Sequence, residues 1–298
     1  MRITRLPDVE RRPRRVAVGT FDGVHLGHRA VIDGADTVLT FEPHPTAVVQ
    51  PGAAPRLLTD LRRKAQLIAS LGAQELVVIP FDREFAARSA QSFVDDVLVG
   101  ALGATHVSVG ENFRFGHKAQ GEAELLRADE RFRTRVVELL EVDGEVVSSS
   151  HIRGLVLGGA VEYAGHLLGD PFTLAGEVAH GDERGRELGY PTANIVPDAA
   201  FVTPGHGVYA AHAQIVGDDG EAGPTYAAAV SIGVRPTFVT GRGELIEAFL
   251  LDFDADIYAS TLELAFLKRL RGEKRFESVG ALVDQMARDV EAARAICD

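Results

Sequence analysis

The fold is decided by residues 19–28, GTFDGVHLGH, which join a short apolar run to the start of a predicted helix. Gly23 and Gly27 leave out side chains where a ligand would approach the backbone. His25 and His28 are three residues apart, so both imidazoles share one face of the first helical turn. Free N–H groups and the positive end of the helix dipole lie at the same place. The stretch therefore predicts a phosphate site between a strand and a helix.

Outward from this stretch, the first half of the chain alternates short apolar runs with helical patterns. Strands are expected at residues 16–19, 37–40, 76–79 and 106–109. Helices are expected at 58–71 and 92–102, with Thr59 and Ser89 as N-caps. This alternation indicates a parallel α/β sheet. Ligands bind beyond the carboxyl ends of such strands, so the polar motifs that follow Val18, Leu39 and Val109 should lie close together.

The second half of the chain changes to consecutive strands. Gly, Pro and Asp clusters, rather than helices, separate β-like runs at residues 172–178, 208–215, 227–232, 246–253 and 262–267. This pattern predicts an antiparallel barrel. Beyond Ser278, a suitable N-cap, apolar residues at helical spacing predict a closing helix. We expect two domains, at 1–169 and 170–298.

The composition restricts the class of protein. The chain has 298 residues, of which 46% are hydrophobic and 25% charged, as in soluble proteins of about two domains. A formal net charge of -12 argues against a nucleic-acid partner. No apolar run approaches the roughly 18 residues of a membrane-spanning helix. The one cysteine, Cys297, excludes an internal disulfide and fits a reducing compartment. We therefore expect a cytoplasmic protein without a membrane or nucleic-acid partner.

Residues 20–28 resemble the HxGH signature of the nucleotidyltransferases, and in particular that of the bacterial bifunctional riboflavin kinase/FMN adenylyltransferases (FAD synthetases). Three further segments match that family in order: TFEPHP at 40–45, GENFRFG at 110–116 and SSSHIR at 148–153. The last has Ser150 where the family usually has Thr. Four motifs in the right order are more specific than any one alone. The resemblance implies a Rossmann-like N-terminal domain that joins AMP from ATP to FMN.

The resemblance also implies roles for single residues. An FMN phosphate is already anionic at neutral pH, so adenylyl transfer needs alignment and hydrogen-bond donors rather than a general base. His28 and Arg153 are the implied catalytic residues. The implied nucleotide-binding residues are Gly19, Phe21, Asp22, His25, His28, Ser148, Ser149 and Arg153. The implied flavin-binding residues are Pro43, His44, Asn112, Phe113 and Phe115.

The second half of the chain resembles the riboflavin kinases. Residues 176–194, GEVAHGDERGRELGYPTAN, end in the PTAN motif of that family, and residues 204–210, 231–238 and 246–253 keep to its pattern. The resemblance implies an antiparallel β-barrel that phosphorylates riboflavin. An alcohol is a poor nucleophile, so a carboxylate is needed to accept its proton.

Glu247 matches the family's catalytic base. The residues implied to bind ATP in this domain are Gly181, Gly189 and Thr192. The oxygen atoms of Thr192 and Asn194 suit Mg²⁺, which prefers hard oxygen ligands. The expected partners are thus the small molecules riboflavin, FMN and ATP, with Mg²⁺ as the metal.

One departure from the family's pattern leaves the activity of the first domain open. Only 11 residues lie between His28 and Thr40, about half the family's usual number, which limits the helix there to roughly two turns. The chain could then be a riboflavin kinase whose N-terminal domain is impaired. It could also be a nucleotidyltransferase for a different phosphate ester, which would not need the PTAN domain, or a non-catalytic flavin sensor, which would not need Glu247.

Overall fold

The computed structural model describes residues 1–180, 189–217, 222–234 and 244–298. The chain divides into two compact units, Met1–Ser149 and Ser150–Asp298. Two helices, α7 (Ser149–Leu157) and α8 (Val161–Leu168), lie between this division and the boundary expected after residue 169. The domain limits 1–169 and 170–298 stay a prediction.

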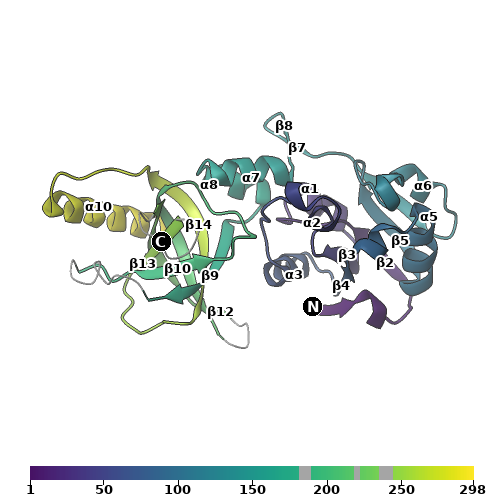
Figure 1. Ribbon diagram of the computed structural model, residues 1–298, viewed down its shortest axis with the longest axis horizontal. Coiled ribbons are helices and arrows are strands. Elements are labelled where there is room, and N and C mark those ends of the chain that lie inside the picture. The colour runs from purple at the N-terminus through teal and green to yellow at the C-terminus, as the bar shows by residue number, and fades with distance from the viewer. Residues whose placement is uncertain (181–188, 218–221, 235–243) are drawn as a thin grey trace. The chain divides into compact units, whose positions relative to one another are not determined.

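The first unit is built on a six-stranded parallel sheet in the order β1-β4-β3-β2-β5-β6 (Figure 1). The strands are β1 (Arg2–Arg5), β2 (Arg14–Val18), β3 (Thr37–Glu42), β4 (Glu75–Pro80), β5 (Ala104–Gly110) and β6 (Arg133–Val137). The four expected strands are all present, which confirms the parallel α/β prediction. The two edge strands, β1 and β6, are additional; each is rich in arginine and lacks a continuous apolar run.

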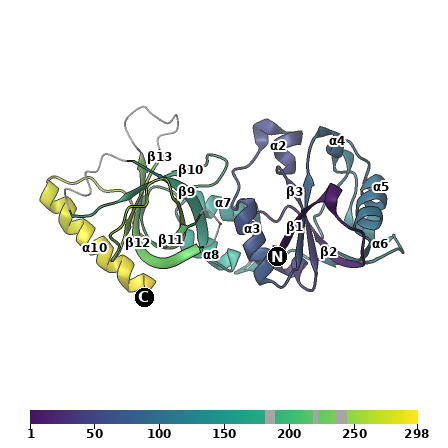
Figure 2. The same cartoon turned by 90° about the horizontal axis from the view of Figure 1, so that it is seen from below.

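Helices cover both faces of this sheet, with α3 on one side and α5 on the other in Figure 2. The helices are α1 (Leu26–Ile32), α2 (Pro45–Val49), α3 (Leu61–Ser70), α4 (Arg83–Ala86), α5 (Ala90–Ser92) and α6 (Ala123–Arg127). Short 3-10 turns lie at η1 (Leu6–Asp8), η2 (Pro51–Ala53) and η4 (His117–Ala119). Alternate residues of β2 face opposite cores: Val16 and Val18 pack in the same core as η3 (Phe93–Ala101), and Ala17 packs in the same core as α1 and α3.

Three local predictions for these helices have different outcomes. Ser89 is confirmed as an N-cap, because its side chain accepts a hydrogen bond from Ser92 N–H. Thr59 was wrong as an N-cap: Asp60 takes that position and accepts from Arg63 N–H at 2.6 Å. The helix expected at 92–102 is present as η3 (Phe93–Ala101), but it has the wider turns of a π-helix.

The second unit contains a closed antiparallel barrel in the order β10-β13-β12-β11-β14-β9. Its strands are β9 (Phe172–Ala179), β10 (Ala193–Pro197), β11 (Gly207–Val216), β12 (Ala222–Val234), β13 (Glu244–Leu250) and β14 (Thr261–Arg271). The barrel prediction is confirmed. Strand β10 was not expected, because it begins inside the PTAN motif, where the sequence carries loop-forming residues.

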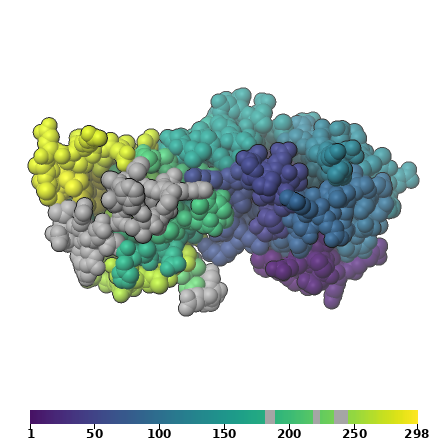
Figure 3. Space-filling model, viewed as in Figure 1, coloured from purple at the N-terminus to yellow at the C-terminus, as the bar shows by residue number. Residues whose placement is uncertain are grey.

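The predicted closing helix is α10 (Val279–Cys297), which packs against β11 and β12. In Figure 3 the end of the chain, in yellow, lies at the surface. Its predicted N-cap is confirmed: the Ser278 hydroxyl accepts a hydrogen bond from Ala281 N–H at 3.1 Å. At the other end, the Cys297 thiol donates to the carbonyl of Ala211 on β11 at 3.3 Å. The last turn of the helix is therefore hydrogen-bonded to the barrel.

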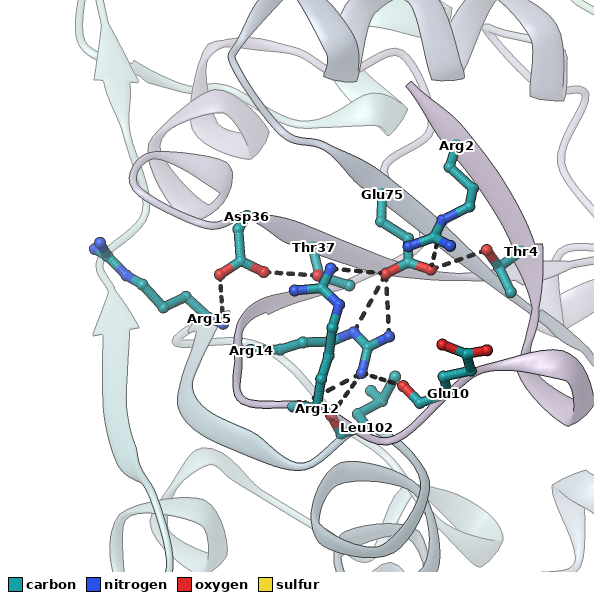
Figure 4. A network of polar contacts seen from close by, with 10 residues as sticks. All are labelled: Arg2, Thr4, Glu10, Arg12, Arg14, Arg15, Asp36, Thr37, Glu75 and Leu102. Atoms are coloured by element: carbon teal, nitrogen blue, oxygen red, sulfur yellow. Dashed lines mark hydrogen bonds and ion pairs between the residues drawn. The ribbon is translucent and has the colours of Figure 1, made fainter.

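A buried ionic network joins the amino ends of three strands in the first unit (Figure 4). The carboxylate of Glu75, the first residue of β4, accepts hydrogen bonds from Thr4, Arg12 and Arg14 and pairs with Arg2. The Glu75 and Arg14 residues are only 2% and 1% exposed. Burial raises the pKa of Glu75, but hydrogen bonds from Thr4, Arg12 and Arg14 outweigh it and hold the pKa below its usual value. The network lies at the opposite end of the strands from residues 19–28.

Candidate active sites

Residues 19–28, the signature stretch, leave the carboxyl end of β2 at the point where the strand order reverses. The chain runs from β2 to β3 and β4 on one side and then crosses to β5 on the other. Ligands bind at such switch points in open α/β sheets. Gly19 N–H donates to the carbonyl of Leu39 at 3.1 Å, and the Thr40 hydroxyl donates to the carbonyl of Thr20, also at 3.1 Å. The motifs that follow β2 and β3 are therefore in contact, as predicted.

The two histidines of the signature stretch form a stacked pair. Their ring centroids are 3.5 Å apart, and His25 Nδ1 accepts a hydrogen bond from His28 N–H, which caps α1. Burial lowers the pKa of His25 to about 4. Burial, His25 and Lys64 together hold the pKa of His28 well below its usual value. Both imidazoles are therefore neutral at neutral pH and can serve as hydrogen-bond donors and acceptors, not as cations.

The backbone of the signature stretch is strained. Phe21 has φ of 49° and Val24 has φ of 43°. Residues other than glycine rarely adopt this left-handed region, and bulky or β-branched residues adopt it least. The two flanking glycines are needed for close packing: a Cβ on Gly19 would lie 3.0 Å from the Phe21 ring, and one on Gly27 would lie 3.2 Å from the His25 ring. Strain of this kind persists where the surrounding structure imposes it, and it gathers at functional sites.

Asp22 ties the signature stretch to the segment that precedes α3. Its carboxylate accepts hydrogen bonds from the N–H groups of Leu58 and Thr59, at 2.8 and 3.3 Å. The Thr59 hydroxyl in turn accepts from Gly23 N–H at 3.1 Å, and the Ser149 hydroxyl donates to the Asp22 carbonyl at 2.9 Å. These contacts of Asp22 hold the turn together, and its role in nucleotide binding stays a prediction.

Lys64 is a further residue at the signature stretch, and it was not predicted from the sequence. It lies on α3, is 5% exposed, and donates from Nζ to the carbonyl of Thr20 at 2.9 Å. One signal in the sequence could have identified it. Lys64 falls among Ala65, Leu67 and Ile68 on the apolar face of the predicted helix, where a charged side chain is unusual.

The segments predicted to bind flavin follow β3 and β5, the two neighbours of β2 in the sheet. After β3, Pro43 follows a cis peptide bond, and His44 Nδ1 accepts from Thr46 N–H to cap α2. After β5, Asn112 is exposed and Phe113 is partly buried. The Phe115 ring stacks beneath that of Phe113 at 5.4 Å and is only 6% exposed. The structure therefore places Phe115 in the core, supporting Phe113 from below.

The motif at residues 148–153 crosses the division of the chain. Ser148 and Ser149 belong to the first unit, whereas Arg153 belongs to the second and lies one turn further along α7. The Arg153 guanidinium donates to the Ser150 hydroxyl at 3.2 Å.

Of the predicted nucleotide-binding residues of the second domain, Gly181 lies outside the described residues. Gly189 is described and has φ of 84°, which favours glycine.

In the barrel, the predicted base and one predicted metal ligand lie opposite each other on two adjacent strands. Asn194 on β10 is paired in register with Glu247 on β13. Ile246 and Ala248 are fully buried, so Glu247 points to the opposite, outer face of the strand. On the same face, the Phe249 ring meets that of Tyr190 edge to face at 5.3 Å. This face therefore combines a carboxylate, an amide and two aromatic rings.

The residues predicted to hold Mg²⁺ fit that ion. The Asn194 amide oxygen is buried and has no hydrogen-bond partner in the described part of the chain, as a ligand-binding oxygen would. Thr192, two residues earlier, is partly buried. Both atoms are hard oxygen donors, which Mg²⁺ prefers. Among residues that the structure describes, no group of three or more His, Cys, Asp or Glu could hold a metal.

Comparison with protein families gives two matches, one for each half of the chain. Residues 8–151 match the FAD synthetase family model, and residues 168–297 match the riboflavin kinase model. The chain is 37% identical over 293 residues to the bifunctional riboflavin kinase/FMN adenylyltransferase of Listeria monocytogenes, covering 94% of this chain and 91% of that protein. The protein of that name from Escherichia coli is 37% identical over 292 residues, with the same two coverages.

The fold also recurs in a solved structure along its whole length. A crystal structure described as a macrolide-efflux protein from Streptococcus pneumoniae is 30% identical and matches 99% of each chain, with a TM-score of 0.86. Within the described residues, no helix is both long enough and apolar enough to cross a membrane.

Proposed function

The chain belongs to the bifunctional riboflavin kinase/FMN adenylyltransferase family, and from this premise we propose that its barrel makes FMN and its first unit makes FAD. Riboflavin would be phosphorylated by ATP in the second domain. FMN would then be joined to AMP from a second ATP in the first, with release of pyrophosphate. The pair Asn194 and Glu247, in register on one barrel face, supports the kinase site. The stacked pair His25 and His28 supports the adenylyltransferase site.

In adenylyl transfer, an FMN phosphate oxygen attacks the α-phosphorus of ATP and pyrophosphate leaves. The nucleophile is already anionic, so the site has to align the two molecules and stabilise the charge that builds on the phosphates. The neutral imidazole of His28 would donate an N–H to a phosphate oxygen. Its neighbours Gly19, Phe21, Asp22 and His25 would shape the nucleotide pocket. Ser148 and Ser149 would complete it, and the resemblance adds Arg153, whose guanidinium carries a permanent positive charge.

FMN would lie across the neighbouring strand ends. Pro43 and His44 follow β3, and Asn112 and Phe113 follow β5, so the two segments flank the signature stretch. Asn112 can hydrogen-bond to a polar edge of the flavin, and the Phe113 ring can pack on its face. Phe115 would act indirectly, by holding Phe113 in place.

In the barrel, Glu247 would accept the proton of the ribityl 5′-hydroxyl as that oxygen attacks the γ-phosphorus of ATP. Gly181, Gly189 and Thr192 would bind the nucleotide. Mg²⁺ bound by Thr192 and Asn194 would supply positive charge to the ATP phosphates. The orphaned amide oxygen of Asn194 supports this assignment. ATP is the co-substrate of both reactions, and the substrates fit a cytoplasmic location.

A kinase with an impaired first domain is not favoured, since both domains are present and the bifunctional relatives match 94% of the chain. The short connector is accommodated: α1 keeps seven residues, about the two turns predicted, and its N-cap is formed.

The direct test separates flavins by chromatography after the full chain is mixed with ATP and Mg²⁺ and either riboflavin or FMN. We expect FAD from both mixtures, with FMN as an intermediate in the first. FMN from riboflavin without FAD from either mixture would reject the proposal for the first unit. No conversion of riboflavin would reject it for the barrel.

A further inference from the structure

A buried lysine lies directly behind the signature stretch. Lys64 is 5% exposed, and its helix neighbours Ala65, Leu67 and Ile68 form part of a hydrophobic core. Lysine is almost never buried to this extent without a partner, because removing an ammonium from water is costly unless polar groups replace the water. A reason for its burial should therefore lie in what the ammonium contacts.

The Lys64 ammonium contacts the backbone of the signature stretch. It donates to the Thr20 carbonyl at 2.9 Å, and the Thr40 hydroxyl donates to the same oxygen at 3.1 Å. Two donors on one oxygen fix the plane of the Thr20–Phe21 peptide. Because a trans peptide is planar, the Phe21 N–H points away from them. In the described part of the chain, no backbone carbonyl accepts a hydrogen bond from that N–H.

The charges around Lys64 connect it to the histidine pair. The groups that face it are the carboxylates of Asp22, Glu42 and Asp60 and the imidazole of His28. Asp22 and Asp60 already accept backbone N–H groups, from Leu58 and Arg63 among others. Burial lowers the pKa of Lys64, and the three carboxylates oppose this shift. The positive charge also helps to keep His28 neutral.

We propose that Lys64 is a positioning residue for adenylyl transfer, which rests on the function proposed for the first unit. Its ammonium holds the Thr20–Phe21 peptide in the strained turn and directs the Phe21 N–H to the side away from Lys64, where a phosphate oxygen can accept it. It also places a positive charge behind the turn, where the two imidazoles, being neutral, supply none. The site thus obtains a cation without exposing it to solvent.

The test compares Lys64→Met, which keeps the length but removes the charge, with Lys64→Arg, which keeps the charge. Both are made in the full chain and assayed for FAD formation from FMN and ATP. We expect Lys64→Met to lower kcat/KM about 100-fold, mostly through kcat, which is about 2.7 kcal/mol of transition-state stabilisation. Lys64→Arg should lose less than about tenfold, because the charge remains.

Two controls separate this role from a purely structural one. Riboflavin phosphorylation by the same molecules should stay unchanged, and Arg63→Gln, which removes a charge from the same helix, should leave FAD formation unchanged. If Lys64→Met does not fold, Lys64→Ala is assayed with ethylammonium, which should restore activity, and with sodium at equal concentration, which should not.

Three outcomes would overturn the proposal: Lys64→Met keeping full FAD formation, Met and Arg variants that fold but are equally impaired, or no effect of ethylammonium. A wild-type chain that forms no FAD would instead reject the proposed function.

Discussion

At the scale of single residues, the stacked histidines determine how the first unit responds to acid. His25 is 5% exposed and caps α1 through its unprotonated Nδ1. A proton on that nitrogen would remove the cap and place a charge in a buried position. In the folded chain the pKa of His25 is therefore lowered to about 4, whereas an ordinary histidine is half protonated at pH 6.5.

This difference predicts that the first unit loses stability between pH 6.5 and 4. In that range the unfolded chain binds more protons than the folded chain. The free energy of unfolding therefore decreases as the pH is lowered, by up to about 1.4 kcal/mol per pH unit from His25 alone. Above pH 6.5 this contribution is complete. Hydrogen exchange of peptides covering β2 and β3 at pH 5 and 7, with each rate corrected for intrinsic pH dependence, measures it. His25→Asn keeps a capping oxygen but has no proton to bind. An equally steep loss in this variant would contradict the prediction.

At the scale of elements, the short helix α1 is secured by a residue from a distant strand. Arg135 on β6 donates to the carbonyls of Ala30 and Asp33, at 3.0 and 2.9 Å, in the last turn of α1. These carbonyls have no partner within the helix, and a cation near them also interacts favourably with the helix dipole. Arg135 therefore holds the carboxyl end of α1 against β6.

We therefore expect Arg135→Ala to destabilise the first unit by about 1 kcal/mol, the usual contribution of an exposed capping interaction. Arg133→Ala is the matched control, because this exposed arginine lies on the same strand. Hydrogen exchange of residues 26–33 measures the effect. Equal exchange rates in the two variants would show that Arg135 does not secure α1.

The network around Glu75 fixes the edge strand β1 in the same way. Glu75→Ala would leave the guanidinium of Arg14, which is 1% exposed, without its carboxylate. Breaking a buried ion pair from one side costs about 3–5 kcal/mol. We expect this loss in the unfolding free energy of the first unit and faster hydrogen exchange in residues 2–5. Glu84→Ala, at an exposed site on α4, should have little effect on either.

The sequence was sufficient for elements with an apolar signature and insufficient for those held by polar contacts. The apolar runs predicted the inner strands, the barrel and α10. The edge strands β1 and β6 carry arginines, and their pairing depends on Glu75 and on contacts that no local pattern encodes. The same holds in the site: the signature histidines were evident, whereas Lys64 required knowledge of which helix packs behind the turn.

At the scale of the whole molecule, the two residues on which the reactions are predicted to depend belong to separate compact units, His28 to one and Glu247 to the other. The two reactions should therefore be separable by single substitutions. Glu247→Gln should lower the rate of FMN formation from riboflavin by about 10²–10⁴-fold, the usual contribution of a general base. It should leave FAD formation from FMN within about twofold of the unmodified chain. His28→Ala should do the reverse.

Flavin chromatography with each substrate measures both activities in each variant. The expected pattern is reciprocal. A substitution that stopped both reactions in a chain that remains folded would contradict the assignment of His28 and Glu247 to different reactions.

The division of the chain also gives it an optical asymmetry. It has no tryptophan, and all five tyrosines, at positions 163, 190, 209, 226 and 258, belong to the second unit, as does the one cysteine. Tyrosine fluorescence therefore follows the second unit alone, whereas circular dichroism follows both. Thiol labelling of Cys297, bonded to Ala211, reports when the end of α10 leaves the barrel. The unmodified chain thus carries built-in probes that can resolve the unfolding of one half from that of the other.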